Sequence, residues 1–162
     1  MNKFVLVDTT YLLPIFGIPL KLDGIERRLE TLFDNYNIVI NSLSLLEAKW
    51  KVLKIARKLK IADDFFREGL IALIHRENVR IINFYLPELD ELAMRLYSIH
   101  KDYFDCSIMA AALYFADVFL TEDSTLIELQ EKVIYPNVLL KKRTTNGLSE
   151  KLEVKRISDF IE

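Results

Sequence analysis

Short apolar runs alternate along the chain with longer stretches in which apolar residues recur every three or four positions. The short runs are typical of buried strands, and they predict strands at residues 3–8, 36–41, 79–84, 118–121 and 153–157, the last at an edge. The longer stretches predict helices at residues 23–33, 42–60, 62–76, 88–100, 103–116 and 124–131. Because strands alternate with helices, we predict an α/β fold, a three-layer α/β/α sandwich with a mostly parallel central sheet.

Three segments have weaker patterns. Residues 11–17 are predicted to be a short helical or irregular piece, and Asp23-Gly24-Ile25-Glu26 has the spacing of a capping box at the start of a helix. Residues 136–149 have no clear period and contain Asn146-Gly147, a turn signal, so we predict a loop there. The sequence contains no repeat, low-complexity tract or linker, and its 162 residues suit a single domain, 1–162.

Composition narrows the class of protein. Hydrophobic residues make up 51% of the chain, enough for a substantial core, and a formal net charge of −2 is unlike that of a basic nucleic-acid-binding protein. The single cysteine, Cys106, excludes an internal disulfide framework and a cysteine-based zinc site, and it fits a reducing, cytoplasmic setting. Asp8 interrupts the first apolar run, so we expect no signal peptide, and residues 11–20 are too short to span a membrane. His75 and His100 are isolated and are expected at surface or helix-end positions.

Four acidic residues stand where the chain is predicted to pass from a strand or turn into a helix: Asp8, Glu47, Asp105 and Asp123. In an open α/β sheet, ligands bind outside the carboxyl ends of the strands, at the point where the strand order reverses. A cluster of carboxylates there is costly unless a cation binds it, and a hard divalent ion such as Mg²⁺ or Mn²⁺ prefers oxygen ligands. The leading hypothesis is therefore metal-assisted hydrolysis of a phosphodiester.

Each of these acids also has a purely structural explanation. Asp8 and Asp123 could cap the helices that follow them, and Asp105 could interact with the positive end of a helix dipole. Glu47 follows Ser44 at the spacing of a capping box. For any one acid the structural explanation is the better one, but for all four together it requires four coincidences of location, whereas a metal site requires one.

Ordered motifs around these acids resemble the PIN-domain family, the nuclease fold that includes VapC-type toxins. The motifs cover nearly the whole chain in the family's order: Val7-Asp8-Thr9-Thr10, Asn41-Ser42-Leu43-Ser44-Leu45-Leu46-Glu47, Asp105-Cys106-Ser107-Ile108-Met109-Ala110-Ala111-Ala112-Leu113, Phe119-Leu120-Thr121-Glu122-Asp123 and the closing segment 154–160. Residues 132–152 are longer than the corresponding stretch of compact VapC-type toxins.

The resemblance implies an α/β/α sandwich, a site for one or two divalent ions, and RNA as the substrate, cut by a metal-activated water. The acids that carry over as the catalytic cluster and the metal ligands are Asp8, Glu47, Asp105 and Asp123. Thr10 or Thr121 carries over as a hydroxyl that hydrogen-bonds a carboxylate or a metal-bound water. Leu126 stands three residues after Asp123, where a second acid would favour two ions, so one ion and two both remain open.

Basic residues offer candidate RNA contacts in two places. A helical face just past Glu47 carries Lys51, Lys54 and Lys58, a spacing that suits contact with successive phosphates. A second run, Lys141-Lys142-Arg143, lies in the predicted loop. Either set could instead be an ordinary solvated surface, which is the better explanation for the loop. Four aromatic residues could stack on bases or fill a partner's groove, although packing in a core or an interface is the better explanation: Tyr11, Trp50, Phe65 and Phe66.

Candidate partners follow from the apolar segment 11–20 and from the resemblance. Pro14, Gly17 and Pro19 prevent this segment from hiding its apolar groups on one face of a regular helix. The resemblance implies a two-fold homodimer, with this segment or the helices from 42 to 76 at or near the contact. The segment could also accept a small antitoxin protein or be buried against its own sheet. Three functions compete: the toxin of a toxin–antitoxin pair, a housekeeping RNA-processing nuclease, and a catalytically silent module that binds RNA or protein. Four retained acids argue against the third.

Overall fold

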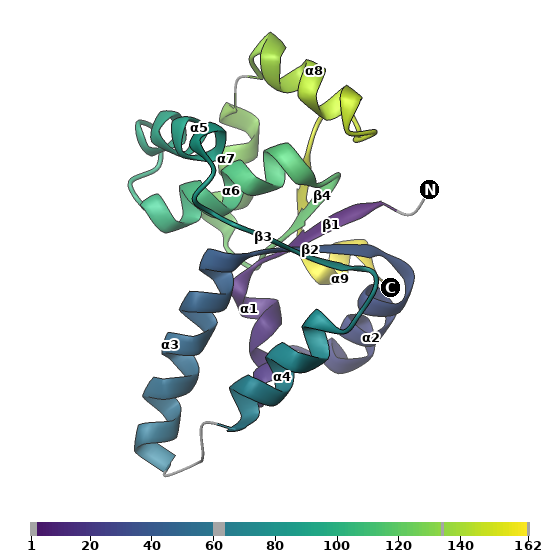
Figure 1. Ribbon diagram of the computed structural model, residues 1–162, viewed down its shortest axis with the longest axis vertical. Coiled ribbons are helices and arrows are strands. Elements are labelled where there is room, and N and C mark those ends of the chain that lie inside the picture. Colours follow the sequence, from purple (N-terminus) through teal and green to yellow (C-terminus); the bar gives the residue numbers. More distant parts are fainter. Residues whose placement is uncertain (1–2, 60–63, 134, 162) are drawn as a thin grey trace.

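The computed structural model describes residues 3–59, 64–133 and 135–161, and the side chains of residues 56–59 also lie outside the description. Within these residues, five parallel strands form one central sheet in the order β3-β2-β1-β4-β5 (Figure 1). The strands are β1 (Phe4–Val7), β2 (Asn37–Asn41), β3 (Val79–Ile82), β4 (Val118–Leu120) and β5 (Glu153–Lys155). The predicted parallel sheet is confirmed, and each strand lies where the sequence predicted one.

Alternation along the strands gives the sheet two apolar faces. Leu6 of β1 pairs with Phe119 of β4, and both belong to the core on one face. Val5 and Val118, their neighbours in the same register, belong to the core on the other face. All four side chains are fully buried. Burial on both sides explains why these strands are continuous apolar runs in the sequence rather than alternating ones.

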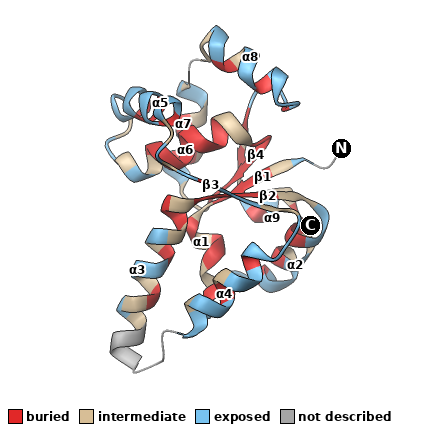
Figure 2. Cartoon of the chain, viewed as in Figure 1, coloured by how far each residue is buried: buried red, intermediate tan, exposed pale blue. Residues whose placement is uncertain are grey.

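The face that includes Leu6 is covered by α5 (Pro87–Tyr97), α6 (Tyr103–Phe115), α7 (Ser124–Lys132) and α8 (Asn137–Thr145) (Figure 1). Helix α6 contacts β1, β2 and β4 directly. Every residue of α6 from Cys106 to Leu113 is buried (Figure 2). Its all-round apolar sequence predicted this central position.

The opposite face is covered by α1 (Thr9–Leu12), the 3-10 turn η1 (Leu13–Phe16), α2 (Ile25–Asn35), α3 (Ser42–Leu59), α4 (Asp64–Ile74) and α9 (Ile157–Phe160). Helix α4 crosses η1 so closely that a Cβ on Gly69 would lie 2.5 Å from the carbonyl oxygen of Ile15. Glycine, which has no side chain, allows this approach. Helix α3 starts at the sheet edge and extends away from it (Figure 1). Neither α3 nor any other described helix is long and apolar enough to cross a membrane. The predicted three-layer sandwich is confirmed.

The structure corrects several predicted boundaries. Most of the predicted loop at 136–149 is helix α8. Helix α2 begins after Gly24, which has a left-handed φ of 67°, and no side chain caps it, so the predicted capping box at Asp23 is wrong. The last strand ends at Lys155, and the short helix α9 follows it. The helix predicted from residue 62 is described from Asp64 onward, and residues 60–63 lie outside the described part of the chain.

The apolar segment 11–20 packs mainly into its own domain. Tyr11, Leu12 and Phe16 are buried, and Phe16 stacks on Phe66 of α4 with ring centroids 4.4 Å apart. Of the alternatives for this segment, burial against its own sheet accounts for these three side chains. The remaining apolar residues of the segment are half-buried or exposed.

Candidate active site

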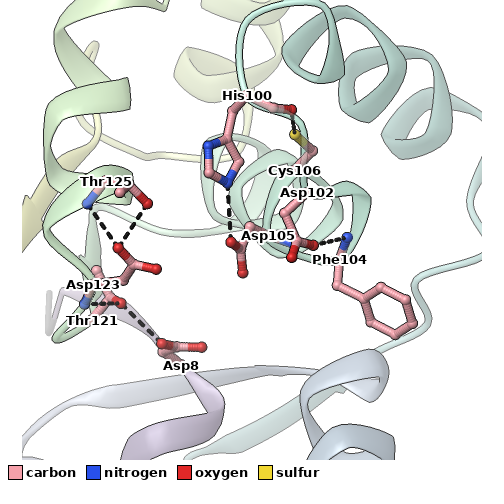
Figure 3. Close-up of polar contacts among 9 residues, drawn as sticks. All are labelled: Asp8, His100, Asp102, Phe104, Asp105, Cys106, Thr121, Asp123 and Thr125. Atoms are coloured by element: carbon pink, nitrogen blue, oxygen red, sulfur yellow. Dashed lines mark hydrogen bonds and ion pairs between the residues drawn. The ribbon is translucent and has the colours of Figure 1, made fainter.

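The strand connections change direction at the carboxyl ends of β1 and β4. These two strands are neighbours, but α1 after β1 covers one face of the sheet and α7 after β4 covers the other. In open α/β sheets, ligands bind between neighbouring strands whose following helices cover opposite faces of the sheet. Asp8 directly follows β1, and Asp123 lies just beyond β4 (Figure 3).

Asp8 caps α1 and is held by two hydrogen bonds. Its carboxylate accepts from the backbone N–H of Thr9 at 2.6 Å and from Thr121 Oγ1 at 2.9 Å. Burial raises the pKa of Asp8 from 3.8 to about 6, although both hydrogen bonds lower it. The nearby charges of Glu47 and Asp105 add to the rise. Asp8 is therefore costly to ionise unless a cation lies beside it.

Thr121 joins Asp8 to Asp123. While its Oγ1 donates to Asp8, it also accepts a hydrogen bond from the backbone N–H of Asp123 at 3.1 Å (Figure 3). Asp123 in turn caps α7, because its Oδ1 accepts from the N–H and from Oγ1 of Thr125, each at 2.7 Å. Asp8 and Asp123 therefore each cap a helix and also belong to the acidic site. The structural and the functional explanation of these two residues are compatible.

Glu47 reaches the site from the second turn of α3. Its Oε2 accepts from Thr9 Oγ1 at 2.6 Å, and its Oε1 lies 2.7 Å from Lys51 Nζ. Both oxygens are thus engaged away from the backbone near Ser44, which lies inside α3, so the capping-box explanation of Glu47 is wrong. The hydroxyl of the first motif that meets a carboxylate belongs to Thr9 rather than to Thr10, because α1 already begins at Thr9.

Asp105 lies in the first turn of α6, beside His100. Asp102 caps this helix by accepting from the N–H groups of Phe104 at 2.9 Å and of Asp105 at 3.3 Å. His100 Nε2 lies 3.0 Å from Asp105 Oδ2 (Figure 3). This contact corrects the expectation that His100 serves only at a surface or a helix end.

Charge effects on the pKa values of Asp8 and Asp105 connect three pairs of these acids: Glu47 with Asp8, Asp105 with Asp8, and Asp123 with Asp105. Burial raises the pKa of Asp105, His100 lowers it, and the charges of Asp102 and Asp123 raise it again. Asp105 and Glu47 act in the same direction on Asp8. The structure therefore brings together, at one edge of the sheet, four acids that the sequence separates by dozens of residues.

The donor set suits a hard divalent cation. Within the described residues, no three histidine, cysteine, aspartate or glutamate side chains already enclose a position for a metal ion. The acids nevertheless present carboxylate oxygens from several elements, and the described ion pairs give neither Asp8 nor Asp123 a basic partner. Oxygen-rich, net-negative surroundings of this kind fit Mg²⁺ or Mn²⁺ rather than a thiophilic metal.

The basic residues of α3 continue from the acidic site. Lys51 pairs with Glu47, and Lys54, three residues further along the helix, is exposed. The side chain of Lys58 lies outside the described part of the chain.

The basic run on α8 lies away from the acids. Lys142 lines a hollow beside Phe4, the first residue of β1, and so lies at the amino edge of the sheet, whereas Asp8 lies at the carboxyl edge. Lys141 is exposed on the same helix. Arg143 is fully buried, and its guanidinium donates to main-chain carbonyls, so the prediction that Arg143 contacts RNA is wrong.

Sequence reasoning missed three side chains of this site: Thr9, Asp102 and His100. Asp102 carried a usable signal, because an aspartate directly before an apolar helix is a typical N-cap. Thr9 adjoins Asp8 in the first motif and differs from the predicted Thr10 by one position. His100 carried no signal, because it lies in the connection between α5 and α6 and meets Asp105 only through packing.

The sequence matches no family model and no curated protein. A solved structure of VapBC2 from Rickettsia felis, bound to a DNA fragment from their promoter, contains a chain that superposes with a TM-score of 0.55. The superposition covers 93% of this chain and 98% of that chain, at 18% sequence identity. The fold is PIN-like. At this identity the likeness shows the fold alone, so the roles of the residues rest on the geometry above.

The raised pKa of Asp8 predicts how stability depends on pH in metal-free buffer. The carboxyl group of Asp8 binds its proton more tightly in the folded protein than in the unfolded chain. Protonation of Asp8 therefore stabilises the fold, fully below pH 3.8, and this stabilisation is lost as pH rises through about 6. We expect the contribution of Asp8 to the free energy of unfolding to fall by about 2 kcal/mol across this window. Urea denaturation in EDTA at several pH values measures the fall. The Asp8→Asn variant should lack this component, and an unchanged profile in that variant would contradict the assignment.

Proposed function

We propose that this protein is a divalent-metal-dependent endoribonuclease, the toxin of a toxin–antitoxin pair. The observation that supports this most is the gathering of four acids at the switch point of a PIN-like sheet. Two of them, Asp8 and Asp105, have raised pKa values because they are buried near other carboxylates. A fold maintained only for packing gains nothing from this arrangement, because it destabilises the metal-free protein.

The residues that would hold Mg²⁺ or Mn²⁺ are Asp8, Glu47, Asp105 and Asp123. When bound, the ion offsets phosphate charge and lowers the pKa of a coordinated water. Thr121 keeps Asp8 and Asp123 in fixed relation through its single hydroxyl. His100 holds the orientation of Asp105, as the outer-shell partner of a metal ligand does. Lys51 and Lys54 favour the approach of the RNA backbone along α3.

An antitoxin is the proposed protein partner. A hollow of about 390 Å³ lies between η1, α2 and α4, lined by apolar residues and by the charged Glu26, Glu30 and Arg76. Its apolar lining includes Pro14, Ile15, Leu29, Phe33, Ala72 and Leu73. An amphipathic helix binds such a groove through its apolar face, so we place the antitoxin here. A two-fold dimer is proposed on the family resemblance, with the apolar segment 11–20 or helix α4 near the contact.

Metal removal tests the catalytic part of the proposal. Purified protein should cleave a labelled single-stranded RNA in Mg²⁺ or Mn²⁺, lose that activity in excess EDTA, and regain it when the metal is restored. A DNA oligonucleotide of the same sequence tests the choice of RNA. An Asp105→Asn preparation, purified in parallel, controls for contaminating nuclease. Full activity in excess EDTA would exclude the proposed mechanism.

A further inference from the structure

One stripe of α3 combines a site carboxylate, an exposed aromatic ring and two lysines. Glu47, Trp50, Lys51 and Lys54 are spaced by three, four and seven residues from the first, so they share one side of the helix. The Trp50 side chain is 67% exposed. The indole ring therefore lies open to a ligand, on a helix that begins at the acidic site.

A second exposed aromatic ring directly precedes one of the acids. Phe104, before Asp105, is 51% exposed, and in Figure 3 its ring points away from the carboxylates. Helices α3 and α6 contact one another, and the amide of Asn41, which precedes α3, donates to the carbonyl of Ser107 of α6 at 3.3 Å. The beginnings of both helices are therefore adjacent, with a solvent-facing ring beside each of their acids.

We propose that Trp50 and Phe104 are base-stacking residues, each holding an unpaired base of the RNA strand whose phosphate lies at the acids. This inference rests on the proposed function. An aromatic ring stacks on any base, because every base has a π-face, and lysines between such rings bind the connecting phosphates. The stripe on α3 supplies one such ring and two lysines, and Lys54 forms no ion pair among the described residues.

Charge decides between RNA and a protein surface. Trp50 shares one side of α3 with Lys51 and Lys54, so a strand covering it meets positive charge at both lysines. Leu46, 46% exposed one turn before Trp50, widens the apolar surface on which a base can rest. A protein partner would need complementary acids here, whereas RNA supplies negative charge at every nucleotide.

Trp50 is the only tryptophan of the chain, so its fluorescence reports directly on stacking. The cleavage-deficient Asp8→Asn variant is titrated with a ten-nucleotide unstructured RNA and with the same sequence as a duplex. We expect saturable quenching by the single strand and little by the duplex, whose bases are already stacked. By anisotropy of labelled RNA, Phe104→Leu and Trp50→Leu should each weaken binding about fivefold to 100-fold.

Phe65→Leu is the matched control. Phe65 lies on α4, is 50% exposed, and packs against Gly17, away from the acids. This substitution should leave RNA binding unchanged.

The outcomes separate the stacking inference from the proposed function. If wild-type protein cleaves RNA but Phe104→Leu and Trp50→Leu bind RNA as tightly as the control, the stacking inference is wrong and the proposed nuclease function is retained. If quenching occurs but wild-type protein cleaves nothing, stacking stands and the proposed function is wrong. A shift in Trp50 emission that follows protein concentration without RNA assigns this surface to a protein contact and overturns the inference.

Discussion

Replacing Asp8 or Asp105 by asparagine should lower the rate of RNA cleavage by a factor on the order of 10³ or more. Each substitution keeps the shape of the side chain but removes one negative charge from the proposed cation site. Asp8 can still accept the hydrogen bond from Thr9 as an asparagine, so the fold should persist. Single-turnover cleavage of a labelled RNA at saturating Mn²⁺ measures the loss.

The same two variants should be more stable than the wild-type protein. Burial and neighbouring carboxylates raise the pKa of both acids, so their ionised forms destabilise the metal-free protein near pH 7. Asp34→Asn is the matched control, because Asp34 lies on α2 in an exposed ion pair with Arg76. It should change neither cleavage nor stability appreciably. Cleavage within a few-fold of wild type in both site variants would remove these acids from the mechanism.

Much of the sheet could be predicted because its signal is local. Strands β1 and β4 are buried on both faces, so their apolar runs stand out from the surrounding sequence. Once two parallel strands are recognised, their carboxyl ends must lie at the same edge of the sheet. Asp8 and Asp123 could therefore be assigned to one edge from the sequence, but that β1 and β4 are neighbours is known only from the strand order.

The partners of these acids could not be predicted in the same way. His100 meets Asp105 because the connection between α5 and α6 folds back over the helix start, which depends on how α5 packs. Thr9 rather than Thr10 meets Glu47 because α1 begins immediately after Asp8. A shift of one residue at a helix start changes which hydroxyl faces the site, and sequence patterns rarely fix helix starts so finely.

Helix α8 shows how tertiary contacts override a weak local pattern. Its sequence has no apolar stripe, and only Leu139 and Arg143 are buried, four residues apart on one face. A buried arginine breaks the expected apolar period, so the segment resembled a basic loop. The partners that make burial of Arg143 acceptable lie elsewhere: the carbonyl of Leu113 at the end of α6 and the carbonyl of Ser149.

Replacing Arg143 by alanine should therefore destabilise the protein without a specific loss of RNA binding. The guanidinium is fully buried and donates to the Leu113 carbonyl at 2.5 Å and to the Ser149 carbonyl at 2.8 Å. Its removal leaves the buried Leu113 carbonyl and the partly buried Ser149 carbonyl without these donors and opens a cavity, so we expect a loss of about 3 kcal/mol in the free energy of unfolding. Lys142→Ala, an exposed neighbour on the same helix, should change it by only about 0.5 kcal/mol. Urea denaturation measures both changes.

RNA binding is compared at a temperature where the Arg143→Ala variant is still folded. The salt dependence of binding should be the same for this variant and for the wild-type protein, because a buried cation neutralises no phosphate. A flatter salt slope together with wild-type stability would return Arg143 to the RNA-binding surface that its sequence suggested.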